Sequence, residues 1–136
     1  MSKTILIVDD DSDTRTVVRT ILSTEGYNTA EVASGEDALE YFKSNEAPAV
    51  VVLDIMMPGI SGLEVALRMK QQPETQRVPI IILTAKDSSD DMLLAYKDYS
   101  IDYYIPKPFN SKQLVNGVNI VLGLDGSQSD SNEEAE

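Results

Sequence analysis

The chain has 136 residues, enough for one domain, and carries 23 acidic against 11 basic side chains, for a net charge of −12. This charge argues against binding to nucleic acids and to anionic membrane surfaces, which proteins contact mainly through Lys and Arg. The sequence contains no Cys and no His, so disulfides are excluded, zinc and haem lose their usual ligands, and any bound metal must be held by oxygen atoms.

No apolar run approaches the roughly 20 residues of a membrane-spanning helix. The amino terminus leads directly into a predicted strand and lacks a secretory signal. We therefore expect a soluble, cytoplasmic domain spanning residues 1–123. Residues 124–136 carry five acids and no base, and this composition predicts a disordered acidic tail or a linker stub.

Strands and helices alternate along the predicted domain. Apolar, largely β-branched runs predict five strands, and amphipathic patterns predict a helix after each of them. Capping pairs indicate where three helices begin, and Gly123 is a stop signal for the last one. In chain order the strands are 4–8, 27–32, 49–53, 78–83 and 101–105, the helices lie around 17–22, 38–42, 63–67, 92–96 and 114–122, and the caps are Ser34 with Asp37, Ser61 with Glu64 and Ser88 with Asp91.

The middle strands are apolar at almost every position, which is typical of strands that are buried on both faces. Five strand–helix repeats of this kind indicate a parallel sheet with helices on both sides. The sequence therefore predicts an α/β domain with a doubly wound, five-stranded parallel sheet.

Polar side chains stand where four of these strands end. Asp9 and Asp10 follow the first strand, Asp54 the third, Thr84 the fourth and Lys107 the fifth. Parallel strands share one carboxyl edge, so these side chains are expected to meet in a crevice there. Two carboxylates about 4 Å apart repel by about 4 kcal/mol at an effective dielectric near 20. A divalent cation would relieve that repulsion, and oxygen ligands favour Mg²⁺.

Carboxylates with a bound cation, an ammonium and a hydroxyl suggest phosphoryl transfer, which needs positioning and charge neutralisation. Asp54 is the best-placed nucleophile, because a carboxylate can form an acyl phosphate. Each residue also has a plainer explanation: Asp11 is expected to cap the first helix, Lys107 taken alone would be a solvated charge, and Thr84 taken alone a turn residue. Their coincidence at successive strand ends favours a site.

The sequence resembles the receiver domain of two-component response regulators over residues 3–123. The resemblance rests on four motifs, Ile5–Asp10, Val52–Gly62, Ile81–Ala85 and Lys107–Phe109. It implies a flavodoxin-like (βα)5 fold with strand order 2-1-3-4-5. It also implies a single-domain, chemotaxis-regulator-like signalling protein that assists only its own phosphorylation and dephosphorylation.

The resemblance assigns roles to matching positions. Asp54 resembles the residue that accepts a phosphoryl group from the phosphohistidine of a sensor histidine kinase, and Lys107 the cation that contacts this group. Asp9, Asp10, Asp54 and the backbone carbonyl of Met56 resemble the Mg²⁺ site. Thr84 and Tyr104 resemble a switch pair, which changes the surface formed by the fourth helix, fifth strand and fifth helix.

The last predicted strand has three local features of note. Pro106 lacks a backbone donor, which is tolerated if this strand lies at an edge of the sheet. Tyr103 and Tyr104 are neighbours and should point to opposite faces. The resemblance further implies a cis Lys107–Pro108 bond.

Three functional hypotheses remain open on the sequence. The first is the phospho-acceptor switch, and the second is a Mg²⁺-dependent phosphatase or phosphotransferase with an Asp nucleophile, although Met56 stands where such enzymes carry a second Asp. The third is an interaction module that is never phosphorylated. The expected partners are a histidine kinase and either a downstream protein or an output domain missing from this chain. We expect no direct nucleic-acid or membrane contact, and a monomer that could dimerise on phosphorylation.

Overall fold

A computed structural model describes residues 3–85 and 101–123 of the chain. Five strands form one parallel sheet in the order β2-β1-β3-β4-β5. This order and the flavodoxin-like architecture confirm the predicted fold class. The strands are β1 (Thr4–Val8), β2 (Asn28–Val32), β3 (Val50–Asp54), β4 (Ile80–Ala85) and β5 (Tyr103–Lys107).

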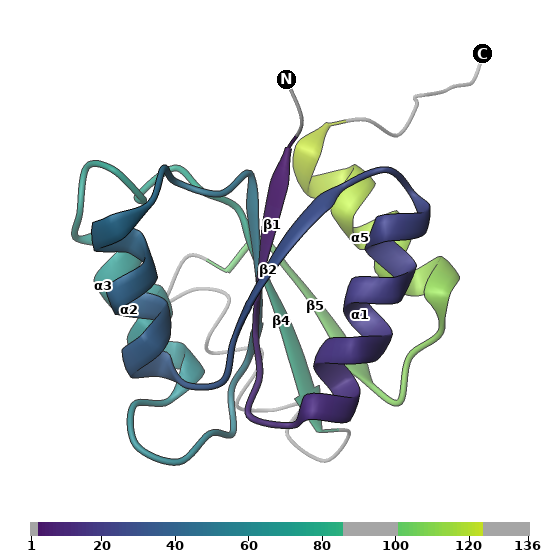
Figure 1. The fold of residues 1–136 in the computed structure, drawn as a ribbon, viewed down its shortest axis with the longest axis horizontal. Coiled ribbons are helices and arrows are strands. Elements are labelled where there is room, and N and C mark those ends of the chain that lie inside the picture. Colours follow the sequence, from purple (N-terminus) through teal and green to yellow (C-terminus); the bar gives the residue numbers. More distant parts are fainter. Residues whose placement is uncertain (1–2, 86–100, 124–136) are drawn as a thin grey trace.

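Helices cover both faces of the sheet (Figure 1). On one face lie α1 (Ser12–Thr24) and α5 (Ser111–Leu122), and on the other lie α2 (Gly35–Ser44) and α3 (Gly62–Lys70). The helix predicted around residues 92–96, its cap Ser88 and the tail 124–136 lie outside the described residues. No helix among the described residues is long and apolar enough to cross a membrane.

Side-chain caps fix where the described helices begin. Ser34 and Ser61 cap α2 and α3 as predicted, each accepting the backbone N–H three residues on. Asp11 caps α1 by accepting the N–H of Asp13. Asn110 caps α5 in a reciprocal arrangement with Gln113 that was not predicted from the sequence. The left-handed Gly123 ends α5.

The core forms two clusters, one on each face of the sheet. Ile5 and Ile7 pack toward α1 and α5, whereas Leu6 and Val8 pack on the opposite side with residues of α2 and α3. All five residues of β3 are buried, because this central strand is covered on both faces. Two-sided burial explains the continuous apolar run that predicted this strand.

The last two strands begin two residues later than predicted. Val78 and Ile101 are buried but precede β4 and β5. Asp102 explains the later starts, since its carboxylate accepts the N–H of Ile80 at 2.8 Å and its own N–H donates to the Ile80 carbonyl at 3.1 Å. An apolar run in the sequence indicates burial and not strand pairing, and here the buried runs begin in the loops before the β4–β5 ladder.

The fifth strand lies at an edge of the sheet, next to β4. Pro106 is therefore in a position where its missing backbone donor is tolerated, as predicted. Tyr103 packs against the cluster under α5 and Tyr104 against the cluster under α2 and α3, so the two rings do face opposite ways. The Lys107–Pro108 peptide bond is cis, as expected.

Candidate functional site

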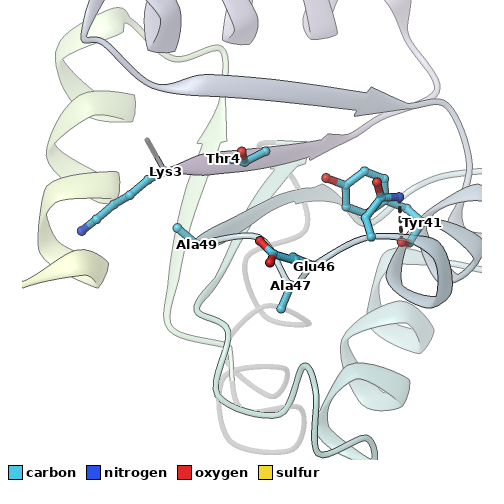
Figure 2. Close-up of a pocket in the computed structure, with 7 residues that line it drawn as sticks. Lys3, Thr4, Tyr41, Glu46, Ala47 and Ala49 are labelled. Atoms are coloured by element: carbon cyan, nitrogen blue, oxygen red, sulfur yellow. Dashed lines mark hydrogen bonds between the residues drawn. The ribbon is translucent and has the colours of Figure 1, made fainter. Parts of the chain in front are cut away.

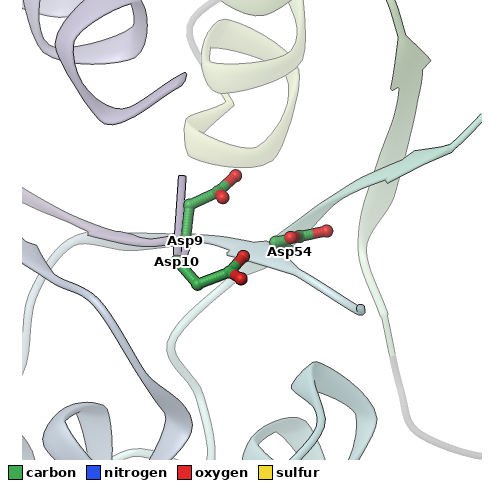
Figure 3. Close-up of side chains that lie close together, drawn as sticks. All are labelled: Asp9, Asp10 and Asp54. Atoms are coloured by element: carbon green, nitrogen blue, oxygen red, sulfur yellow. The ribbon is translucent and has the colours of Figure 1, made fainter. Parts of the chain in front are cut away.

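Three carboxylates meet at the carboxyl edge of the sheet. Asp9 and Asp10 follow β1, Asp54 ends β3, and one oxygen from each lies within 4.8 Å of the others (Figure 3). Val8 pairs with Leu53 in the β1–β3 ladder, so Asp9 and Asp54 are one step beyond the last paired residues. Asp9 is fully buried, Asp54 is 6% exposed and Asp10 is open to solvent. The ladder thus brings two acids 45 positions apart in sequence into one crevice.

Asp9 is held through both its side chain and its backbone. Its carboxylate accepts the N–H of Asp11 at 2.9 Å and lies 3.2 Å from the Lys107 ammonium. Its own N–H donates to Val32 O at 3.2 Å. Its carbonyl oxygen accepts a 2.6 Å hydrogen bond from the Arg15 guanidinium. The two carboxylate contacts compensate the burial of the charge, and the two backbone contacts fix the main chain of Asp9.

Asp54 has weaker compensation. Its carboxylate accepts the Met56 N–H at 3.3 Å, and the Lys107 ammonium lies 3.8 Å away. Burial, followed by the negative charge of Asp9, raises the pKa of Asp54 to about 6, against the opposing effect of Lys107. The carboxylate at the end of the central strand is therefore less stable in its charged form than an ordinary Asp.

The segment after Asp54 turns tightly into α3. Met57 N–H and Gly62 N–H both donate to the Ile55 carbonyl, at 3.1 and 3.0 Å. A Cβ on Gly62 would stand only 2.1 Å from the Asp54 carbonyl oxygen, so only glycine allows α3 to begin this close to β3. Met56 lies on this segment and its side chain is 67% exposed. The close packing fixes the direction in which the chain leaves Asp54.

The remaining predicted residues are placed to different extents. Lys107 ends β5 with its ammonium between Asp9 and Asp54. Thr84 occupies β4 in register with Pro106, although its side chain lies outside the described part of the structure. Tyr104 is half-buried on β5, the strand that Lys107 ends. The structure therefore brings Asp9, Asp10, Asp54 and Lys107 together, and it places Tyr104 on the same strand as Lys107 and Thr84 on the neighbouring strand β4.

Two contacts near the site were not anticipated from the sequence. Arg15 binds the Asp9 carbonyl, and Glu36 at the start of α2 accepts the Ile60 N–H at 3.3 Å. A polar residue in the first turn of a helix that follows a strand is only a weak signal of such a contact, because these residues are ordinarily solvated. Both contacts support loops that carry predicted site residues.

The donor set fits a hard divalent cation. Within residues 3–85 and 101–123, Asp9, Asp10 and Asp54 are the one group of three acids arranged to hold a metal ion. Carboxylate oxygens at this spacing suit Mg²⁺, which keeps waters or phosphate oxygens in its other positions. The cation would also offset the burial and the negative charge of Asp9, which together raise the pKa of Asp54.

A separate pocket of about 460 Å³ lies at the opposite edge of the sheet, where β1 begins (Figure 2). Lys3 and Thr4 line it together with Tyr41 and the segment after α2. The Asn45 side-chain amide donates to the Tyr41 carbonyl at 3.1 Å there. The pocket is lined by none of the site residues described above.

Comparisons with known proteins identify the class that this fold and site define. Residues 5–119 match the sequence model of the response regulator receiver domain. The chain belongs to that family, and so to the signalling domains of two-component systems.

Individual relatives agree with this assignment. The chain is 36% identical over 126 residues to the phosphate regulon transcriptional regulatory protein PhoB of Pseudomonas aeruginosa, covering 93% of this chain and 54% of the relative. Among solved structures, it is similar to the Vibrio cholerae chemotaxis protein CheY4, with a TM-score of 0.83, 26% identity and coverage of 90% of this chain and all (100%) of the other. It is also similar to a response regulator receiver domain protein from Clostridium thermocellum, with a TM-score of 0.81, 27% identity and coverage of 89% and 94%. The chain spans about half the length of the curated relatives that it matches.

Proposed function

We propose that the chain is a phospho-acceptor signalling switch in which Asp54 receives a phosphoryl group from a sensor histidine kinase. The observation that carries the proposal is the placement of Asp54. It ends the central strand with Asp9 and Asp10 beside it and the Lys107 ammonium at 3.8 Å. An acceptor carboxylate, a cation and a cluster of acids are the groups that phosphoryl transfer to Asp requires.

In the proposed step, an Asp54 oxygen attacks phosphorus in line with the P–N bond of the donor phosphohistidine. The new O–P bond gives an acyl phosphate, and the P–N bond breaks with its electron pair returning to the imidazole, which takes a proton from solvent. Lys107 neutralises charge on the transferring group. Mg²⁺ held by Asp9, Asp10, Asp54 and the Met56 carbonyl would neutralise further charge and orient the phosphoryl oxygens. This chain contains no His, so the phosphohistidine belongs to the kinase.

The output of the switch is proposed to begin at Thr84 and Tyr104. The hydroxyl of Thr84 would move toward the phosphoryl group, and the Tyr104 ring would turn inward to fill the vacated space. The surface affected comprises β5, α5 and the helix predicted around residues 92–96, which lies outside the described residues. A downstream protein, or an output domain joined beyond residues 1–123, would recognise that surface.

The test is labelling with a small acyl phosphate in the presence of Mg²⁺, followed by intact-mass measurement. Wild type should gain one base-labile phosphoryl group, and Asp54→Asn should gain none. Asp13→Asn removes an exposed acid in the first turn of α1 and should label like wild type. Equal labelling of wild type and Asp54→Asn would contradict the proposal, as would steady hydrolysis of unrelated phosphomonoesters, which would indicate the phosphatase.

A further inference from the structure

Arg15 reaches from α1 to the end of β1. Its guanidinium donates a 2.6 Å hydrogen bond to the backbone carbonyl of Asp9, and its side chain is only 18% exposed. The contact is to the main chain of Asp9, whereas the Asp9 carboxylate faces Lys107. Arg15 is therefore next to the acidic cluster without contributing a ligand atom to it.

A second contact holds the guanidinium from the side of β2. The Nε atom of Arg15 lies 3.3 Å from the Glu31 carboxylate, and Glu31 also pairs with Arg19 one turn further along α1. Glu31 is on β2 in register with Ile7 of β1. Because a guanidinium is planar with a fixed set of donors, its contact with Glu31 on β2 restricts where its second partner, the Asp9 carbonyl, can lie.

The carbonyl that Arg15 binds belongs to the peptide group between Asp9 and Asp10. The Asp9 N–H is already fixed by Val32 O. Since a peptide group is planar and extends to the Asp10 Cα, holding its carbonyl oxygen restrains the plane and, together with φ of Asp10, the direction in which the Asp10 side chain leaves the backbone. Asp10 is exposed, and among the described residues none donates a hydrogen bond to its carboxylate, Arg15 included. Its direction depends on this peptide.

We infer that Arg15 is a positioning residue for the divalent cation, acting through the Asp9–Asp10 peptide. The inference rests on the proposed function, since the cation site is part of it. Groups that orient metal ligands without touching the metal have a large influence on affinity, and losing one costs about tenfold or more. Arg15 would set the geometry of Asp10, while Glu31 holds Arg15 in place.

The sign of the effect separates positioning from simple electrostatics. Arg15 is a cation beside a site for another cation, so Coulomb repulsion alone predicts that neutralising it tightens Mg²⁺ binding. Loss of positioning predicts weaker binding. Arg19 is the matched control, because it shares the partner Glu31 and the helix α1 but makes no described contact with Asp9.

The experiment is calorimetric titration of the full chain with Mg²⁺ for wild type, Arg15→Gln, Arg15→Lys and Arg19→Gln. Arg15→Gln should raise the dissociation constant about tenfold. Arg15→Lys keeps the charge but loses the planar fork, and it should also bind more weakly than wild type. Arg19→Gln should bind like wild type. In metal-free samples, the backbone amide resonance of Asp10 should shift in Arg15→Gln and stay unchanged in Arg19→Gln.

Several outcomes would overturn the inference. Tighter or unchanged Mg²⁺ binding by Arg15→Gln would show that the contact does not position Asp10. If Arg15→Gln does not fold, wild-type affinity in Arg15→Lys would lead to the same conclusion. Equal weakening by Arg15→Gln and Arg19→Gln would assign the effect to the ion pairs that both arginines make with Glu31, and not to the contact between Arg15 and the Asp9 carbonyl. Failure of wild type itself to bind Mg²⁺ would refute the cation site and with it this inference, whereas normal wild-type binding with an unaffected Arg15→Gln refutes the inference alone.

Discussion

Asp9 and Asp54 stand at the ends of neighbouring strands and are both buried, yet the contacts that compensate their charges differ. Asp9 accepts a backbone N–H at 2.9 Å, pairs with Lys107 at 3.2 Å and is anchored at its carbonyl by Arg15. Asp54 has a longer hydrogen bond of 3.3 Å and a more distant ammonium at 3.8 Å, and its pKa rises to about 6. The well-compensated acid is suited to a fixed ligand, whereas the poorly compensated one gains most from a new bond.

The largest expected effect on the surroundings of Asp54 comes from Gly62, which packs directly against the Asp54 backbone carbonyl. Gly62→Ala should lower the free energy of unfolding by more than about 3 kcal/mol, because the new methyl would meet the Asp54 carbonyl oxygen of the backbone. Urea denaturation measures the loss. Gly62→Ala should also abolish acyl-phosphate labelling, because the new methyl group displaces the backbone of Asp54.

Gly117 supplies the control for that substitution. A Cβ there would lie 3.0 Å from the Tyr103 ring, a side chain that can give way. Gly117→Ala should therefore change stability by less than about 1 kcal/mol, with the helix preference of Ala offsetting the contact. A loss of stability as large as that of Gly62→Ala would contradict the explanation that contact with the Asp54 backbone oxygen makes the Gly62 substitution costly.

Removing the charge of Asp54 tests whether its carboxylate is less well compensated than that of Asp9. Asp54→Asn is expected to stabilise the metal-free protein at neutral pH by about 3 kcal/mol, because the pKa rises from 3.8 to about 6 and each unit is worth about 1.4 kcal/mol. Denaturant unfolding of both proteins at about pH 4 and about pH 7 measures the difference.

The pH dependence has a defined sign. Below pH 3.8 the carboxyl is protonated in folded and unfolded chains alike, so it contributes nothing. Between 3.8 and about 6 only the folded protein keeps the proton, so stability falls as the pH rises through this window. The advantage of Asp54→Asn should thus be small near pH 4 and complete near pH 7. A stability advantage of Asp54→Asn that is equal at pH 4 and pH 7 would show that the fold does not disfavour the charged form of the Asp54 carboxylate.

Lys107→Met tests the cation that the two acids share. We expect a loss of about 2 kcal/mol in the metal-free protein, because the fully buried Asp9 loses its ammonium partner, with a discount for the 28% exposure of Lys107. Added Mg²⁺ should restore part of the loss in thermal unfolding. A variant as stable as wild type without Mg²⁺ would mean that the remaining hydrogen bonds suffice for Asp9.

Asp11→Ala should have the smallest effect. The substitution removes the cap of α1 and the hydrogen bond from Thr14, so a small decrease in Tm is expected. The Asp9 carboxylate keeps its hydrogen bond, because that donor is the backbone N–H of residue 11. Acyl-phosphate labelling should be unchanged, and a loss of labelling would give Asp11 a role beyond capping.

The sequence predicts the fold well because its physical signals are redundant. The apolar run 49–53, the caps Ser34 and Ser61 and the stop at Gly123 are local signals that agree with the elements of the folded sheet. Strand starts are less predictable. Ile101 is as apolar as a strand residue, but the Asp102 contacts to Ile80 set where the β4–β5 ladder begins.

The candidate site is predictable at its strand ends and not beyond them. Parallel strands carry Asp9, Asp54 and Lys107 to one edge whatever the loops do. The hydrogen bond from Arg15 to the Asp9 carbonyl depends on the angle at which α1 leaves β1. Such a contact leaves no pattern in the sequence, because its acceptor is a backbone atom that every residue possesses.

The pairing of Val8 with Leu53 in the β1–β3 ladder has a consequence for folding. A slip of this ladder by one residue would turn Asp54 to the opposite face of the sheet from Asp9. The acids would then be separated, and an apolar residue of β3 would stand at the edge in place of a charge. The proposed cation site would therefore exist only in the native alignment, and Mg²⁺ bound there would selectively stabilise chains whose central strands have aligned correctly.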